Sequence, residues 1–110
     1  DVSESEPPPT QPPHTMRRRF EREDDVVYMV TISLQPRGDK IRDNLRARQV
    51  HGTLISYPGR DQFAFQVFEN GETHLIEFPG DTTHLNAEVV NRLVDILGEE
   101  NVQIEKLPYH

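Results

Sequence analysis

Apolar and polar residues alternate along VVYMVTISL, residues 26–34. A period of two places alternate side chains on one side of an extended chain, and the segment is rich in β-branched residues. The pattern therefore predicts a strand with one buried face. The apolar positions of that face are Val26, Tyr28, Val30, Ile32 and Leu34. Pro36 and Gly38 end the strand, because proline has no amide hydrogen for a ladder and glycine tolerates turn geometry.

A helix is predicted over residues 40–56, with Asp39 as the N-cap and only Gly52 interrupting a run of good helix formers. Apolar residues fall on two of its sides. The stripe expected to be buried comprises Ala47, Val50, Leu54 and Tyr57. The apolar side left over comprises Ile41, Leu45 and Ile55. Pro58 and Gly59 end the helix.

Two short strand-forming runs follow, QFAFQVF at residues 62–68 and THLIEF at residues 73–78. Asn70-Gly71 between them is a strong signal for a two-residue type I′ turn, so the pair is predicted to form a hairpin. One face of the hairpin is expected to be apolar and aromatic. Its residues are Phe63, Phe65 and Val67 on the first strand and His74, Ile76 and Phe78 on the second.

A second helix is predicted after the hairpin. Its apolar stripe comprises Val90, Leu93, Val94 and Leu97. Either Asn86 or Thr83 suits the N-cap, and Gly98 lies where a C-terminal glycine belongs. The segment NVQIEKL, residues 101–107, then predicts a last strand with Val102 and Ile104 on one side.

The predicted order of elements is βαββαβ. This order is typical of ferredoxin-like folds of the α+β class, in which two helices cover one face of a four-stranded antiparallel sheet. The other face of such a sheet is often open to a partner. The fold itself says little about activity.

The domain organisation follows from length and composition. The chain has 110 residues and no cysteine, and its first fifteen residues include five prolines. A Pro-rich, aliphatic-poor segment buries too little surface to fold, so residues 1–25 are predicted to be a disordered linker and residues 26–110 one small domain. The chain begins with Asp1 rather than Met, which suggests a fragment of a longer protein. Short apolar runs and the lack of cysteine lead us to expect a cytoplasmic protein without a membrane span.

The formal net charge is −7. Proteins that bind nucleic acid chiefly through its phosphates usually carry a basic excess. The negative net charge therefore argues against a nucleic-acid-binding protein unless the positive residues gather on one face. The triplet Arg17, Arg18 and Arg19 is interpreted as the solvated end of the linker.

The run Asp81, Thr82, Thr83 and His84 has residue types used in hydrolysis. It lies just before the second helix, however, where hydroxyl and acid side chains bind unpaired amides, and this structural interpretation is favoured. The histidines are scattered, so the metal-ligand spacings of zinc sites are missing, as is a Gly-rich phosphate loop. We predict no catalytic residue, no metal and no cofactor in this fragment.

Residues 26–105 resemble the C-terminal region of the alpha subunit of bacterial DNA polymerase III, after its oligonucleotide-binding domain. The matching positions are Gly38, Asp39, Arg42, Asp43, Leu45, Arg46, Tyr57, Pro58, Gly59, Asp61, Phe63, Phe78, Pro79, Thr82, Thr83, Leu97, Gly98 and Val102. Gly80 and Ala47 depart from the pattern, where related chains often carry Asn and Leu.

The resemblance implies a replicative DNA-directed DNA polymerase, a nucleotidyltransferase whose catalytic aspartates and magnesium ions lie in domains outside this chain. It also implies attachment to the tau subunit of the clamp loader. We therefore expect a monomeric, non-catalytic protein-interaction module that meets DNA through the parent polymerase. Its expected partner-binding residues are Ile41, Leu45 and Ile55.

A different class of function remains open, namely a ferredoxin-like module that binds nucleic acid through the first helix. Its contact residues would be Arg37, Lys40, Arg42, Arg46 and Arg48. Against it, Asp39 and Asp43 are expected to pair with these cations along a solvated helix. A regulatory small-molecule module of the same fold is a third possibility, for which no residue argues.

Overall fold

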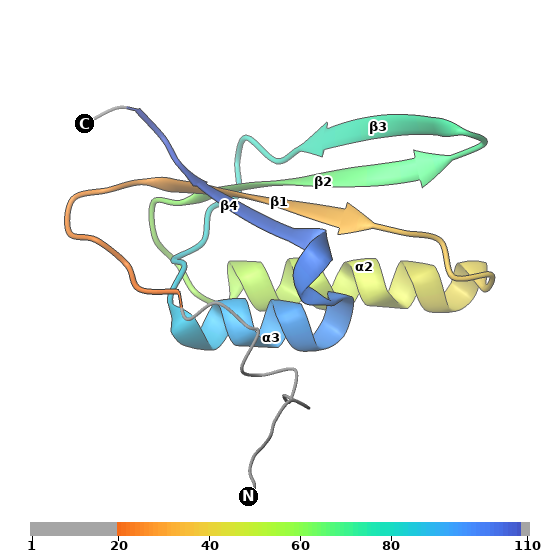
Figure 1. The fold of residues 1–110 in the computed structure, drawn as a ribbon, viewed down its shortest axis with the longest axis horizontal. Coiled ribbons are helices and arrows are strands. Elements are labelled where there is room, and N and C mark those ends of the chain that lie inside the picture. The colour runs from red at the N-terminus through yellow and green to blue at the C-terminus, as the bar shows by residue number, and fades with distance from the viewer. Residues whose placement is uncertain (1–19, 109–110) are drawn as a thin grey trace, which may run out of the picture.

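The structure is a computed structural model that describes residues 20–108. Its elements are β1 (Tyr28–Leu34), α2 (Lys40–Ile55), β2 (Gln62–Glu69), β3 (Glu72–Glu77), α3 (Ala87–Leu97), the 3₁₀ turn η2 (Glu99–Asn101) and β4 (Val102–Lys106). Both helices lie on the same face of the sheet (Figure 1). The predicted α+β class and the βαββαβ order are confirmed.

The sheet is mixed, so the predicted antiparallel, ferredoxin-like sheet is wrong. Its strand order is β3-β2-β1-β4, with β1 and β2 parallel and the other two pairs antiparallel. The split arrangement inserts another strand between the two that flank the first helix, whereas here β2 pairs directly with β1 and places Val30 beside Phe63. Periodicity identifies which face of a strand is buried, but it does not identify the neighbouring strand.

The predicted hairpin is confirmed. Phe68 pairs with Thr73, and Phe65 pairs with Ile76. The turn residues Asn70 and Gly71 have φ angles of 53° and 78°, and positive φ at both central positions is what a type I′ turn requires.

Two glycine substitutions are expected to change stability in opposite directions. Gly71→Ala should lower the free energy of unfolding by about 1 kcal/mol, because a side chain is strained at positive φ. Gly52→Ala should raise it by about 0.5–1 kcal/mol, because Gly52 lies inside α2 and an added Cβ meets nothing within 4 Å. Urea unfolding of both variants measures the difference, and a change of the same sign in both would contradict the turn assignment.

Helix α2 begins as predicted and ends at Ile55, one residue before the predicted end. The Asp39 carboxylate accepts hydrogen bonds from the amides of Ile41 and Arg42 at 3.0 and 3.1 Å. These bonds satisfy two of the amides that a helix start leaves unpaired. Val50 and Leu54 are fully buried, while Ala47 and Tyr57 of the same predicted stripe are half-buried. The rotation of α2 about its axis is therefore the predicted one.

Helix α3 is capped by Asn86, whose side chain accepts a hydrogen bond from the amide of Val89 at 3.0 Å. The alternative cap, Thr83, is wrong: its backbone instead forms a two-bond bridge with Asp61. The buried stripe of the helix comprises Val89, Val90, Leu93 and Leu97. Gly98 ends the helix with a φ angle of 95°.

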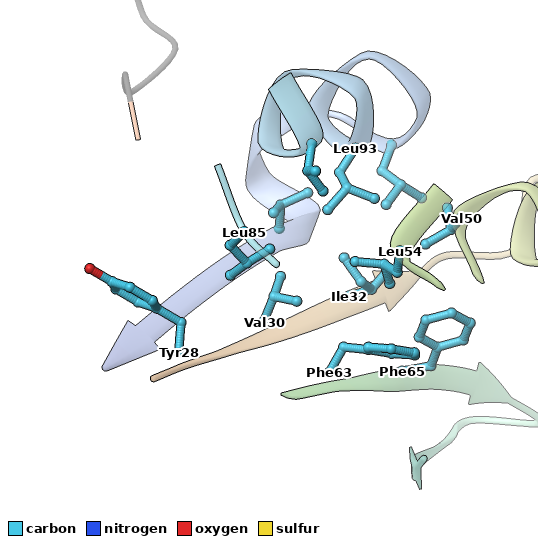
Figure 2. Packing of buried hydrophobic residues seen from close by; sticks show 12 residues of the cluster. Tyr28, Val30, Ile32, Val50, Leu54, Phe63, Phe65, Leu85 and Leu93 are labelled. Carbon is cyan, nitrogen blue, oxygen red and sulfur yellow. The ribbon is translucent and has the colours of Figure 1, made fainter. Parts of the chain in front are cut away.

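The core lies between the sheet and the two helices. In Figure 2, Val30 and Ile32 of β1 point toward the layer that contains Leu85 and Leu93. Phe63 of β2 and Leu54 of α2 close the core beside them, and both are almost completely buried. In β4, Val102 is buried and Ile104 packs against the same core, as predicted for one face of that strand.

Residues 1–19 of the predicted linker, which spans residues 1–25, lie outside the described residues. The remainder, residues 20–25, contacts the domain through Phe20 and Arg22. The Phe20 ring packs edge-on against Tyr28 with 5.1 Å between ring centroids, and Arg22 forms an ion pair with the buried Asp61. Within the described residues, contacts with the domain therefore begin at Phe20, six residues before the predicted start at residue 26. Composition gives no sign of these contacts, because a charged side chain such as Arg22 gains its stabilising partner only in the folded chain.

Neither helix in residues 20–108 has the length and apolar character that crossing a membrane requires.

Candidate interaction surface

The apolar side of α2 is exposed, as predicted. Ile41, Leu45 and Ile55 expose 73%, 57% and 45% of their surface. Positions 41, 45, 48, 52 and 55 follow the spacing of three and four that forms one face of a helix, so these three side chains, with Arg48 and Gly52, form one stripe. We call it the α2 stripe. Several large apolar side chains on one exposed face typically mark an interaction site rather than a random surface.

The segment around the start of the α2 stripe is basic. Residues 37–48 hold five basic and two acidic residues, a net charge of +3, whereas residues 20–108 hold nine basic and sixteen acidic residues, a net charge of −7. The five cations are the predicted nucleic-acid contacts Arg37, Lys40, Arg42, Arg46 and Arg48. Positive charge in this domain is therefore concentrated beside Ile41 and Leu45.

Three of these arginines have partners within the domain. Arg46 pairs with Asp43 at 2.8 Å and Arg42 with Asp39 at 3.6 Å. The guanidinium of Arg37 donates to the carbonyl of Leu97 at 3.4 Å. The Arg46 hydrogen bond is the main cause of a lowered Asp43 pKa. The expected pairing of Asp39 and Asp43 with the helix cations is confirmed, and it reduces the charge available to phosphates.

A groove of about 500 Å³ runs between the two helices beside the α2 stripe. Leu45 and Gln49 line it from α2, and Ile96 and Asp95 line it from α3. Arg42 and Arg46 also border it. The groove extends the apolar surface from Leu45 toward Ile96, so a helix or strand laid along α2 has a second apolar contact on α3.

The Asp81-to-His84 run does not form a catalytic pair of its own. Asp81 instead pairs with His51 of α2, with 3.1 Å between Oδ2 and Nε2. The His51 ring lies among Phe63, Phe65 and Phe78. His51 was not among the predicted site residues, although its position three residues before the buried Leu54 places it near the side of α2 that faces the sheet. Its carboxylate partner, thirty positions away, left no local signal.

The His51–Asp81 pair has the geometry of a base held by an acid, which requires a nearby nucleophile for hydrolysis. Thr83 is fully buried and its hydroxyl makes no hydrogen bond within residues 20–108, so a substrate has no access to it. Among the same residues, no three histidine, aspartate or glutamate side chains gather in a way that fits a metal ion. We interpret the pair as a structural contact between α2 and the loop after β3.

Asp61 holds four segments of the chain together. Its carboxylate is fully buried and accepts hydrogen bonds from the amides of Tyr28 at 2.9 Å and Leu85 at 2.7 Å. It also accepts two from the guanidinium of Arg22, which donates in turn to the carbonyls of Val26 and Leu85. We call this set of contacts the Asp61 network. No role for Asp61 could be predicted, since nothing in YPGRD distinguishes a buried aspartate from an exposed turn residue.

Burial on its own raises the pKa of Asp61. The hydrogen bonds from Arg22 and from the amides of Leu85 and Tyr28 outweigh burial, so the net pKa lies below its ordinary value. The pKa of Arg22 is raised, mainly by its hydrogen bond to Asp61. The network is therefore a stable ion pair with a structural role.

No protein-family model, curated protein or solved structure matches this chain.

Proposed function

We propose that this domain is a non-catalytic protein-interaction module that binds its partner through the α2 stripe. The observation that carries the proposal is the exposure of Ile41, Leu45 and Ile55 on one helix face. Burying such side chains against a partner supplies affinity, and the surrounding charges supply register. Because the flank of the stripe is basic, the complementary partner surface is apolar with an acidic rim.

We further propose that the module belongs to the C-terminal region of a bacterial DNA polymerase III alpha subunit and attaches it to the tau subunit of the clamp loader. The sequence resemblance supports this assignment. Several positions that carry the resemblance have structural roles here: Asp39 caps α2, Asp61 centres the buried network and Gly98 ends α3. In this proposal nucleotide transfer and DNA contact belong to the rest of the polymerase, and the domain works in the cytoplasm as a monomer.

One observation favours the alternative, a nucleic-acid-binding module. The net charge of +3 over residues 37–48 stands out in an acidic domain, and Lys40 and Arg48 have no ion-pair partner within the described part of the chain. The pairing of Arg42 and Arg46 with aspartates weakens it, because those pairs must be broken or shared when a phosphate binds.

Salt dependence separates the two functions. We expect the affinity of the labelled chain for the tau subunit to fall only mildly between 50 and 200 mM salt, because salt screens the charges of the rim but not the apolar contacts at the centre. Phosphate binding by Arg42, Arg46 and Arg48 should instead weaken about twentyfold over the same range, since each neutralised phosphate of single-stranded DNA releases counterions.

Fluorescence anisotropy with the tau subunit and, separately, with single-stranded DNA makes the comparison. An Arg42→Gln, Arg46→Gln, Arg48→Gln variant is the matched control, because it removes the phosphate contacts and keeps the three apolar side chains of the α2 stripe. Salt-sensitive DNA binding that this variant loses, together with no response to tau, would refute the attachment proposal.

A further inference from the structure

A second groove, of about 240 Å³, lies at the edge of the sheet away from the α2 stripe. It is formed by α3, by β4 and by the segment that leads into β1, and none of its lining residues belongs to α2. Its apolar floor includes Phe20, Tyr28, Val94 and Ile104. Tyr28 lies at the outer end of the core, with its hydroxyl pointing away from the labelled aliphatic residues (Figure 2).

The groove exists because β4 is an edge strand that α3 covers only in part. Val102, at the start of β4, is buried, whereas Ile104 is half-buried and Lys106 is exposed. All three face the helix side, since they pair with Ile32, Val30 and Tyr28 of β1. Within the described residues the outer edge of β4 has no neighbouring strand. An apolar surface beside the free edge of β4 is therefore left uncovered within the described residues.

The rim of this groove is acidic. Its charged lining residues are Glu21, Glu23, Glu99, Glu105 and Lys106. Lys106 forms an ion pair with Glu23, and the pKa of Lys106 is raised chiefly by that hydrogen bond. Arg22, whose guanidinium lies over the ring of Tyr28, is engaged by the Asp61 network. Four carboxylates and one ammonium leave the groove with a net charge of −3.

We propose that this groove is a docking site for a cationic amphipathic segment of a partner protein. Apolar side chains of the segment would lie on Val94 and Ile104, and its Lys or Arg side chains would meet the glutamates of the rim. The negative charge of the rim selects a cationic occupant, because it repels an acidic segment, a nucleic acid or an anionic membrane. The site is independent of the proposed function, since it shares no residue with the α2 stripe.

The probe is a labelled amphipathic helical peptide of leucine and lysine, compared with the same peptide carrying glutamate in place of lysine. We expect the full chain to bind the lysine peptide and not the glutamate peptide, with methyl NMR shifts at Val94 and Ile104. The double variant Glu21→Lys, Glu105→Lys should weaken binding of the lysine peptide about tenfold or more, because it reverses two rim charges.

The matched control is Glu69→Lys, Glu77→Lys, which makes the same change in net charge at two exposed glutamates outside the groove. It should alter binding of the lysine peptide by about twofold or less. Unchanged NMR dispersion in both variants shows that they fold. An equal loss in both variants, or methyl shifts confined to other residues, would overturn the proposal.

Two other occupants give distinct results. If the lysine peptide binds only after Arg17, Arg18 and Arg19 are changed to glutamine, the groove is filled by the chain's own arginine segment, and the proposal of an external partner is wrong. If wild-type chain self-associates and the Glu21→Lys, Glu105→Lys variant does not, the occupant is the basic α2 of a second copy, and the proposal is again wrong.

Discussion

Replacing Asp61 with alanine is expected to lower the free energy of unfolding by about 3–5 kcal/mol, the cost of removing one partner from a buried ion pair. The Asp61 side chain is completely buried, and Arg22 is 19% exposed. Without the carboxylate, the amides of Tyr28 and Leu85 lose their acceptor, and the Arg22 guanidinium loses its counter-charge. Because each of these groups lies in a different segment, the loss affects the whole domain rather than one turn.

Urea unfolding followed by circular dichroism measures this change. Asp24→Ala is the control, since Asp24 is an exposed carboxylate of the same type, and its effect should stay within about 0.5 kcal/mol. A loss below about 1 kcal/mol in Asp61→Ala would show that the network contributes far less than its burial implies.

The same carboxylate predicts a pH dependence. The folded-state pKa of Asp61 is lowered, so its contribution to stability is present above the unfolded pKa and is lost as the pH falls through the folded pKa. Stability should therefore decrease below about pH 4. The decrease should be shallower in Asp61→Asn, which has no proton to bind at this position. Equal slopes in the wild type and the variant would exclude Asp61 as a cause.

Leu45→Asp is expected to weaken binding of the tau subunit by about a hundredfold or more while the domain stays folded. Leu45 lies within the α2 stripe and also lines the groove between the helices, so a partner that covers this surface must bury the new charge. The few hot-spot residues near the centre of an interface cost about 2 kcal/mol or more when they are changed, and burying a new charge adds to that cost. The fold should tolerate the change, because the leucine is already 57% exposed.

Leu75→Asp is the matched control for this experiment. Leu75 of β3 has the same exposed fraction, 57%, but belongs to the edge of the sheet. Titration calorimetry with tau, together with the unfolding midpoint of each variant, separates a binding effect from a folding effect. An equal loss of affinity in the two variants, or no loss in Leu45→Asp, would contradict the assignment of the partner surface to α2.

Local pattern was sufficient for every element that depends on near neighbours in the chain. Asp39 and Asn86 are caps because they precede helix-forming runs, and Asn70-Gly71 forms its turn because two successive residues must adopt positive φ. The exposure of Ile41, Leu45 and Ile55 was predictable too. An α-helix that buries Val50 and Leu54 must turn residues on the opposite side toward solvent.

Only the tertiary structure decided which segments meet. The alternation in residues 26–34 is the same whether the neighbouring strand is parallel or antiparallel, so the mixed sheet was not encoded in any single stretch. The Asp61 network, the His51–Asp81 pair and the acidic groove each combine residues that lie far apart in the sequence. Their charges and hydrogen bonds become significant only when folding removes water from around them. In the unfolded chain the Asp61 carboxylate is hydrated like that of any surface aspartate, and only folding brings its donors to it from three other segments.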